Sequence, residues 1–390
     1  MLQKILTFFQ KETVLSISAI LAILSMFIVH PSGKYFSYID FRTLSLLFCL
    51  MSIVAGLSEI GLFDYLAEKI LSRANSIKSI IVLLVLLCFF FSMIITNDVA
   101  LITFVPFAII ILKKMSEKQK NYWILRTVVM QTIAANLGSM LTPLGNPQNL
   151  YLYTISGLSL WDFIRIMLPY SAVSALLLIL FLLVLPKVSF QAGNFSAVQT
   201  ESSACSTDKP ASSRSHRNPR ILFAAYCILF LICLLTVLHI LPFQIMLLIV
   251  FFGFLILDYH VLKDVDYFLL LTFFCFFLFI GNIKQIPFVH DLIAVLLVQH
   301  EVSIGIISSQ IISNVPAAIL LSGFTNNYSA LLIGVNLGGL GTLIASLASL
   351  ISFKFYANTD GSNKKRYLGI FTLYNAIFLV ILFGLYRFFG

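Results

Sequence analysis

Long apolar runs separated by short polar stretches dominate this sequence. A helix that crosses a membrane needs about 20 mostly apolar residues, and many of the runs reach or approach that length. The apolar runs cover residues 13–29, 43–58, 79–112, 122–153, 163–186, 221–238, 242–257, 267–282, 302–325, 329–356 and 367–388. The pattern predicts an all-α polytopic membrane protein.

Polar residues interrupt two of these runs near their centres. Thr-Asn-Asp at residues 96–98 interrupts the run 79–112, and Ser-Asn-Val-Pro at 313–316 interrupts the run 302–325. The second interruption leaves 11 residues on each side of its Ser-Asn pair. A helix of that length rises about 16 Å, roughly half the hydrocarbon core. We therefore predict two re-entrant hairpins and about nine spanning helices, with a pair of spanning helices as the alternative to the first hairpin.

Helix-breaking residues interrupt two further runs. Residues 135–149 hold two glycines and two prolines, and residues 336–342 hold three glycines. Such residues cannot continue an ideal helix. In hydrocarbon the freed backbone groups need partners, so a break survives only where it is buried or lines a cavity. The sequence thus predicts two broken helices, at 122–153 and 329–356.

Short motifs recur in the two halves of the chain. Asn-Leu-Gly at residues 136–138 recurs at 336–338, and Ile-Ile-Thr-Asn at 94–97 recurs as Ile-Ile-Ser-Asn at 311–314. With nine crossings the two hairpins open toward opposite sides of the membrane. This arrangement is an inverted-topology repeat, which is typical of secondary transporters.

The repeat divides the chain into three parts. Residues 1–188 form the first half, with a short amphipathic arm on the inner surface before its hairpin. Residues 189–219 are rich in serine and predict a flexible cytoplasmic linker. Residues 220–390 form the second half.

Composition and charge exclude several classes of protein. Apolar residues make up 60% of the chain and charged residues 11%, which excludes a soluble or disordered protein. The net charge is +9, but the basic residues form short clusters between apolar runs. With the N-terminus inside, 20 of the 25 Lys and Arg residues lie in or beside inner segments, as the positive-inside rule requires. We therefore predict a plasma-membrane protein with its N-terminus and residues 187–220 in the cytoplasm, and no nucleic-acid partner.

Motifs of enzymes and metal sites are absent from the sequence. The chain contains no HExxH, GxSxG, P-loop lysine or dinucleotide-binding motif. Its six histidines show no metal-ligand spacing. We predict a protein that is not an enzyme and holds neither a cofactor nor a structural metal.

The interruptions carry the candidate chemistry. A half-helix that starts at mid-membrane points free N–H groups and a partial positive charge at the gap, which favours an anion without Lys or Arg. Carbonyl oxygens at the opposite helix ends, together with Asn and Ser/Thr oxygens, suit Na⁺. Asp98 is the one carboxylate that we expect deep in the membrane. It could carry a proton, bind a cation or lie in a vestibule.

These four segments resemble a known group of transporters. The hairpin segments 96–106 and 313–316, and the broken segments 136–149 and 336–342, resemble those of the ion transporter superfamily. That superfamily includes citrate-transporter-like permeases, divalent anion/sodium symporters, arsenite permeases and sodium/proton antiporters. The resemblance covers about residues 40–388. It implies a scaffold domain that forms a homodimer and a transport domain that moves like an elevator.

The resemblance also implies roles for individual residues. The Asn-Asp pair at the first tip is closer to the arsenite-permease and antiporter branches, and Val315 stands where anion symporters carry a hydroxyl. The implied substrate-binding residues are Thr96, Asn97, Asp98, Thr142, Pro143, Asn146, Ser313, Asn314 and Thr342. The implied cation-binding residues are Asn97, Asp98, Asn136, Gly138, Asn314, Asn336 and Gly338.

Three functions are compatible with these features. The first is a secondary active transporter of a small anion, a carboxylate or an inorganic oxyanion, coupled to Na⁺ or H⁺. The second is a cation/proton antiporter or arsenite-type efflux permease that uses Asp98. The third is a passive channel or a membrane subunit that transports nothing.

The predicted sidedness is testable with cysteine labelling. A membrane-impermeant maleimide should reach native Cys205, and a Lys118→Cys variant, only from the cytoplasmic side. Labelling of either position exclusively from the outside would invert the topology.

Overall fold

A computed structural model describes residues 12–71, 76–113, 115, 117–184 and 218–389, and in these ranges the regular structure is entirely helical. The predicted linker lies outside the described residues, except for residues 218 and 219. The helices are α2 (Thr13–Ile28), α3 (Tyr35–Tyr38), α4 (Phe41–Glu59), α5 (Leu62–Leu71), α6 (Ile77–Ile95), α7 (Asn97–Lys113), α8 (Glu117–Ser139), α9 (Pro147–Ser156), α10 (Leu160–Val184), α12 (Pro219–Val237), α13 (Phe243–Leu257), η2 (Val261–Asp264), α14 (Tyr267–Ile283), α15 (Pro287–Leu297), α16 (Glu301–Ile312), α17 (Asn314–Leu321), α18 (Tyr328–Gly338), η3 (Leu343–Ala345), α19 (Leu347–Ala357) and α20 (Lys364–Phe389).

Several of these helices are long and apolar enough to cross a membrane. Five qualify by length and composition within the described residues, namely α4, α6, α10, α12 and α20. The pair α14 and α15, bent by 104°, raises this number to six if it counts as one span. Shorter apolar helices of 10–17 residues include α16, α18 and α19, which belong to the second hairpin and the second interrupted helix. The all-α membrane class predicted from the sequence is confirmed.

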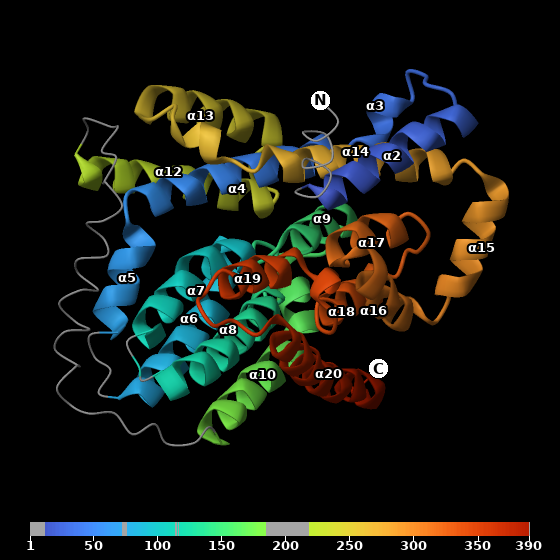
Figure 1. Cartoon of the computed structure of the whole chain (residues 1–390). Coiled ribbons are helices and arrows are strands. Elements are labelled where there is room, and N and C mark those ends of the chain that lie inside the picture. Colours follow the sequence, from blue (N-terminus) through green and yellow to red (C-terminus); the bar gives the residue numbers. More distant parts are fainter. Residues whose placement is uncertain (1–11, 72–75, 114, 116, 185–217, 390) are drawn as a thin grey trace, which may run out of the picture.

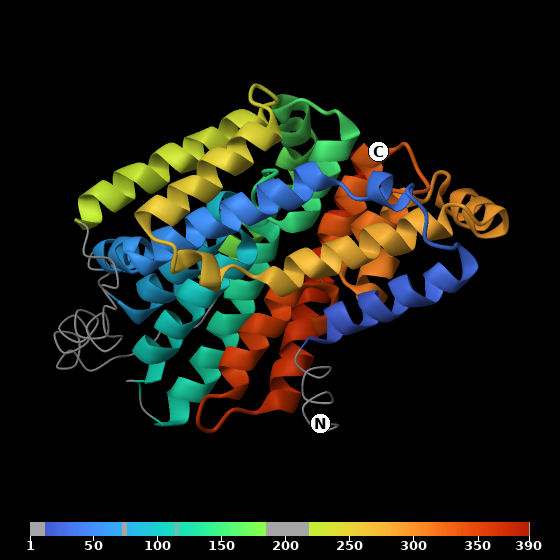
Figure 2. The ribbon, with the colours of Figure 1, turned by 90° about the horizontal axis from the view of Figure 1, so that it is seen from above.

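The helices form two layers that run beside each other (Figures 1 and 2). The first layer, called the upper layer from its place in Figure 1, contains α2, α3, α4, α12, α13 and α14. The lower layer contains α6–α10 and α16–α20. Helices α5 and α15 descend from opposite ends of the upper layer and lead into the lower one. The chain therefore passes through both layers in each of its halves.

Polar caps and aromatic rings position two helices of the upper layer. Asp40 caps α4 by accepting from the Thr43 N–H at 3.1 Å, and Asp266 caps α14 in the same way. Gly281 of α14 lies against the ring of Tyr38, where a Cβ atom would overlap the ring. Asn282 of α14 donates to the Tyr35 hydroxyl at 3.0 Å. These contacts hold α14 against the N-terminal part of the chain.

Both predicted hairpins turn at their polar residues. The backbone between α6 and α7 turns at Thr96 with φ 75° and ψ 150°, and that between α16 and α17 turns at Ser313 with φ 73° and ψ 155°. Positive φ is uncommon for residues other than glycine, and more so for a β-branched residue. Helix α6 packs on α7, and α16 packs on α17. The two turns share one unusual conformation, and each places an asparagine at the next position.

The order of elements is the same in both halves of the described chain. Helix α4, arm α5, hairpin α6–α7, interrupted helix α8–α9 and helix α10 follow one another in the first half. Helix α14, arm α15, hairpin α16–α17, interrupted helix α18–α19 and helix α20 follow in the second. The interruptions fall at 140–146 and 339–346, where prolines and glycines predict them.

Two glycines allow each interrupted helix to approach its own hairpin closely. A Cβ atom on Gly138 of α8 would overlap the carbonyl oxygen of Phe89 in α6. A Cβ atom on Gly338 of α18 would overlap the Ser309 hydroxyl in α16. The backbones are therefore in direct contact, as small residues permit between membrane helices.

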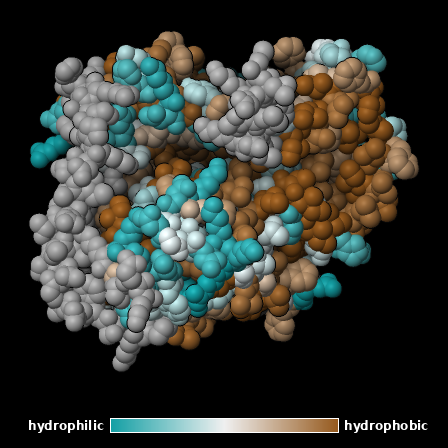
Figure 3. All heavy atoms as spheres, in the orientation of Figure 1, coloured by the Kyte–Doolittle hydropathy of each residue, from teal (hydrophilic) through white to brown (hydrophobic). Residues whose placement is uncertain are grey.

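The surface agrees with a membrane environment. Figure 3 shows apolar side chains over much of one face and a hydrophilic patch near its centre. Large apolar side chains such as Phe252, Ile256 and Phe288 are exposed. Contiguous exposure of this kind suits contact with lipid.

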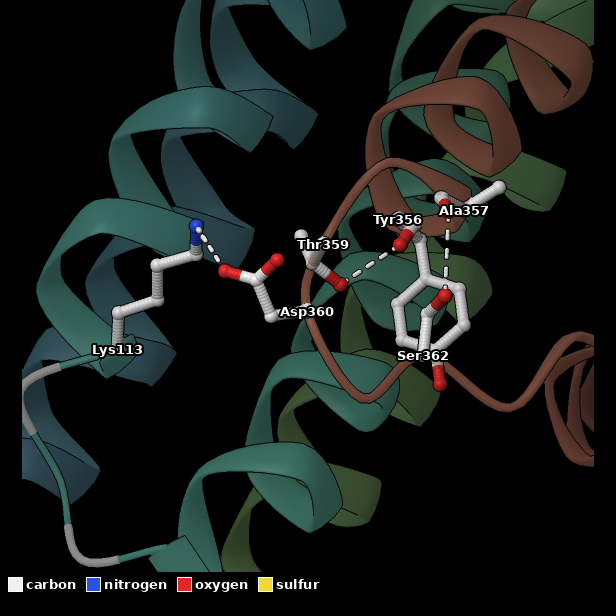
Figure 4. Close-up of polar contacts among 6 residues, drawn as sticks. All are labelled: Lys113, Tyr356, Ala357, Thr359, Asp360 and Ser362. Atoms are coloured by element: carbon white, nitrogen blue, oxygen red, sulfur yellow. Dashed lines mark hydrogen bonds and ion pairs between the residues drawn. The ribbon is translucent and has the colours of Figure 1, made fainter.

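A polar loop joins α19 to α20 and contacts the first half (Figure 4). Lys113, at the end of α7, lies 3.8 Å from the Asp360 carboxylate in this loop. The Thr359 hydroxyl donates to the Tyr356 carbonyl, and the Ser362 hydroxyl donates to the Ala357 carbonyl. The ion pair is solvent-exposed, so it contributes little to stability. The loop's own hydrogen bonds hold its shape.

The close helix contacts lead to a stability prediction. Gly138→Ala should lower the melting temperature of the detergent-purified protein, because its methyl group has no room beside Phe89 and overpacking costs about 1–3 kcal/mol. Gly384→Ala in α20, where nothing lies within 4 Å of the added carbon, is the control and should not lower it. Equal melting temperatures for both variants would contradict the described packing.

Candidate functional site

Each hairpin tip lies against the interruption of its own half. The Asn97 N–H donates to the Gly145 carbonyl at 3.0 Å, and the Ser313 hydroxyl lies 3.5 Å from the Ala345 carbonyl. Gly145 and Ala345 directly precede Asn146 and Ser346, the N-cap residues of α9 and α19. Both tips therefore meet the start of a half-helix.

Asn136 of α8 connects the first tip with the second half of the chain. Its Oδ1 accepts from Asn97 Nδ2 at 3.1 Å and from the Ser346 hydroxyl at 3.1 Å. Its Nδ2 lies 3.4 Å from both the Gly339 carbonyl and the Ser349 hydroxyl. An asparagine side chain offers two donors and two acceptor positions, so Asn136 uses all four.

Asn336 of α18 makes the reciprocal contacts with the first half. Its Oδ1 accepts from Asn146 Nδ2 at 3.3 Å, and its Nδ2 donates to Asn149 Oδ1 at 2.7 Å. Positions 146 and 149 correspond to 346 and 349, the positions that Asn136 contacts. Each asparagine before a break is thus bonded to the half-helix that follows the other break.

Side-chain amides also satisfy the backbone of both breaks. Asn149 Nδ2 donates to the carbonyls of Ser139, Met140 and Thr142 at 3.1–3.3 Å. In the second half, Gln310 of α16 makes the hydrogen bonds to the backbone of the break. Its Nε2 donates to the Gly338 and Leu340 carbonyls at 2.8 Å, and its Oε1 accepts from the Thr342 N–H at 2.9 Å.

The two threonines of the breaks bond to the hairpin arms. The Thr142 hydroxyl donates to the Met93 carbonyl, and the Thr342 hydroxyl lies 3.4 Å from the Gln310 carbonyl. Met93 and Gln310 both lie three residues before a hairpin turn. These hydroxyls connect each break to its hairpin.

Asp98 occupies a different environment from the asparagines. Its backbone N–H donates to Asn97 Oδ1 at 3.0 Å, but its carboxylate has no hydrogen-bond or ion-pair partner in the described part of the chain. It lies in the first turn of α7, where the helix dipole favours negative charge. Asp266, at the start of α14, is the charged group that acts on it electrostatically.

The structure brings most of the predicted residues into this region. Asn97, Asn136, Asn146 and Asn336 belong to one hydrogen-bonded network, and Asn314 lies beside it at Gly339. The two predicted residues Gly138 and Gly338 lie at helix contacts, and their carbonyls accept from the Leu141 N–H and from Gln310. Of the others, Thr96 and Ser313 form the turns, and Pro143 is buried within the first break.

Several residues of the network were not predicted from the sequence. They are Ser139, Asn149, Gln310, Ser346 and Ser349, each with a hydrogen bond described above or, for Ser139, to Asn146 at 3.1 Å. Gln310 carries a sequence signal, since it is a lone amide in an apolar run. The serines carry none, because isolated serines are common in membrane helices.

The network can hold a small ion without any basic side chain. The side chains joined by these contacts are amides and hydroxyls, and the nearby helix starts supply N–H groups. Nearly all of them are buried, with Asn97, Asn146, Asn314 and Asn336 at most 5% exposed. Among the described residues, no three His, Cys, Asp or Glu side chains are grouped to hold a metal ion.

Gln310 provides a direct test of this arrangement. Gln310→Met introduces the residue found at the corresponding place in the first half and leaves the Gly338 and Leu340 carbonyls without their donor. A buried polar group without a partner costs about 1–3 kcal/mol, so the melting temperature should fall and any transport should be lost. Gln285→Met, at an exposed position, is the control. An unchanged melting temperature for Gln310→Met would show that the amide does not stabilise the break.

Comparisons with known proteins identify the family of this chain. A family model described as Citrate transporter (CitMHS) matches residues 5–330. An uncharacterized transporter, MJ0456, of Methanocaldococcus jannaschii is 31% identical over 374 residues, or 94% of this chain and 93% of that protein. Inner membrane protein YbiR of Escherichia coli K12 is 32% identical over 356 residues, or 90% and 88%. The putative transporter arsB of Dictyostelium discoideum is 26% identical over 130 residues, or 33% and 22%.

The family model and the first two relatives cover most of the chain, and the family and two of the three relatives are named as transporters. They agree with the apolar helices described above. They also agree with the prediction that the protein is not an enzyme. The chain therefore belongs to the citrate transporter family, and it is a membrane-embedded transporter of the citrate transporter and arsenite permease type that handles an ionic substrate.

Proposed function

We propose that this chain is a secondary active transporter that moves a small anion, a carboxylate or an inorganic oxyanion, together with Na⁺ or H⁺. The observation that carries the proposal is the meeting of two hairpin tips and two helix breaks in one buried network of amides and hydroxyls. An ion bound there is desolvated and held by neutral donors and acceptors from both halves.

The chemistry of the network supports an anion as substrate. Four helices start at it, namely α7, α9, α17 and α19. A helix start offers N–H groups and a partial positive charge, so it holds an anion without Lys or Arg. The implied substrate residues at the tips and breaks remain our candidates.

The arrangement of the two halves supports an inverted repeat and elevator-type transport. The same order of elements occurs twice, and the contacts of Asn136 and Asn336 are reciprocal. In the proposed cycle the lower layer carries the site past the upper layer, and the arms α5 and α15 accommodate the movement. A homodimer formed through the upper layer would hold that layer still in the membrane.

The coupling ion and the sidedness complete the proposal. Backbone carbonyls at the breaks and the asparagine oxygens suit Na⁺, while the carboxylate of Asp98 suits either Na⁺ or H⁺. The positive-inside count supports a plasma-membrane location with the N-terminus in the cytoplasm.

Asp98 supports a second candidate function. A carboxylate in the first tip, without a basic partner among the described residues, can exchange protons or cations across a membrane. A cation/proton antiporter or arsenite-type efflux permease would use it as the central group. A cation/proton antiporter of this kind would exchange cations for protons and would need no anionic substrate.

A transport assay separates these functions from each other and from a channel. Purified full-length protein in liposomes should take up one of citrate, succinate, sulfate, phosphate or arsenite, with Na⁺ and pH gradients imposed separately. Counterflow, in which internal substrate accelerates uptake, identifies a carrier. Uptake without counterflow would indicate a channel, and proton movement driven by Na⁺ alone would favour the antiporter.

The same assay tests the assigned site. Asn136→Ala and Asn314→Ala should abolish counterflow, because each removes an amide at the meeting point of the halves. Asn375→Ala is the matched control, a buried asparagine of α20 that bonds to Phe371 of its own helix. Full activity of both site variants would show that the transported ion does not bind at this network.

A further inference from the structure

An arginine of the upper layer lies at the turn between α12 and α13. Arg42, in the first turn of α4, is half-buried, and its Nη2 donates to the Thr236 carbonyl at 3.1 Å. The same carbonyl accepts from the His239 N–H at 3.1 Å. The guanidinium group therefore lies beside the backbone of His239. The predicted topology places this turn on the outer side of the membrane.

The lower layer reaches the same place through α9. The ring of Tyr153 lies 5.5 Å from the imidazole of His239, at an angle of 63°, and α9 packs on α4. Arg42 acts electrostatically on both Tyr153 and His239. Figure 2 shows the yellow α12–α13 turn next to the green segment around α9. Arg42, Tyr153 and His239 thus form a cluster, called the seam cluster, to which both layers contribute.

The positive charge of Arg42 has no ion-pair partner in the described part of the chain. Asp40, two residues earlier, uses its carboxylate to accept from the N–H and the hydroxyl of Thr43. A cation in the first turn of a helix opposes the helix dipole. Arg42 therefore does not stabilise α4 by its charge, and it adds to the positive end of that helix.

The seam cluster has the chemistry of an anion site. A guanidinium group has five N–H donors in a planar fork, and one donor of Arg42 is used in the hydrogen bond to Thr236. Such a fork pairs with two oxygens of a carboxylate or an oxyanion. His239 is exposed and its neighbour Ile240 is 67% exposed, so a ligand can reach the cluster from solution.

The seam cluster lies close to the asparagine network without belonging to it. Asn146, the N-cap of α9, is part of the network, and Tyr153 lies seven residues further along. Seven residues of helix rise about 10 Å. A charge acts on an ion in solution over a Debye length, about 8–10 Å at physiological salt. The network itself has no basic side chain, so Arg42 supplies an attraction that the network lacks.

We propose that the seam cluster is a second anion site, at which the transported anion is captured on its way to the asparagine network. Its ligand is a carboxylate or an inorganic oxyanion from solution, held by the Arg42 fork beside His239 and Tyr153. Because Arg42 belongs to the upper layer, the site stays in place while the lower layer moves. This inference rests on the proposed function.

Protection of a cysteine from labelling tests the site directly. In a Cys205→Ser background, Ile240→Cys places a thiol next to His239, and the same protein without this cysteine is the blank. The probe is whichever of citrate, succinate, sulfate or phosphate the wild type transports. At saturating concentration it should slow maleimide labelling of the detergent-purified protein by at least about threefold.

Variants show whether Arg42 provides this protection. Arg42→Gln, which keeps an N–H donor for the Thr236 carbonyl, should abolish it. Arg42→Lys keeps the charge but loses the fork, and it should raise the half-protecting concentration by at least about threefold. Arg165→Gln, at an exposed arginine of α10, is the matched control and should leave protection unchanged. Asn136→Ala should leave it unchanged as well, because the seam cluster does not include the network.

Transport in liposomes measures the consequence of capture. In Arg42→Gln the KM for the anion should rise by at least about threefold on the side from which Ile240→Cys is labelled. On the opposite side it should change by less than about twofold. Phosphatidylglycerol micelles, added to the labelling reaction in place of the anion, present the same oxyanion chemistry on a lipid.

The outcomes separate this inference from the proposed function. If the wild type transports none of these anions, the proposed function fails. If it transports one that gives no protection, or if protection survives Arg42→Gln or is lost in Asn136→Ala, the second site alone is overturned. Protection by phosphatidylglycerol but not by the transported anion would indicate a lipid headgroup and overturn it too. An unchanged KM in Arg42→Gln, or an equal rise on both sides, would exclude capture.

Discussion

Hydrogen-bonding groups that leave a helix inside a membrane must find partners within the protein, and this requirement dictates the centre of the structure. Both interrupted helices expose such groups, and each relies on the other half of the chain to satisfy them. Asn136 bonds to Ser346 and Ser349, and Asn336 bonds to Asn146 and Asn149. The two breaks therefore have to cross at one place.

The crossing determines where an ion can bind. Each hairpin tip is bonded to the break of its own half, so the crossing of the breaks also brings the tips together. The region is polar enough to replace a hydration shell, yet none of its amides or hydroxyls carries a charge. Neutral groups bind an ion less tightly than a salt bridge would, which suits a transporter that must release its substrate on the other side. Asp98 is the exception, because its carboxylate can add a negative charge to the first tip.

The features that sequence alone predicts are those set by local chemistry. Apolar run length predicts the helices, prolines and glycines predict the breaks at 140–146 and 339–346, and the Asn-containing interruptions predict the tips. What the sequence does not predict is which partner each polar group takes. Asn149 and Gln310 satisfy the two breaks in different ways, and this choice depends on helices that approach each other only in the folded chain.

Gly138 also has a role in the structure that its sequence motif does not predict. Its place in an Asn-Leu-Gly motif suggests a carbonyl that coordinates a cation, whereas its Cα face lies against the Phe89 carbonyl. Whether a glycine serves by its carbonyl or by its lack of a side chain depends on the neighbouring helix. Close packing of α8 on α6, and of α18 on α16, is the visible role of these glycines.

An experimental structure of the protein in lipid nanodiscs, determined with its transported anion, tests the central claim most directly. The account predicts density for the anion where the two hairpin tips meet the two breaks, with Asn136 and Asn336 still bonded across the breaks. An anion bound between the two layers and away from both breaks, or asparagines that face lipid beside continuous helices, would contradict it.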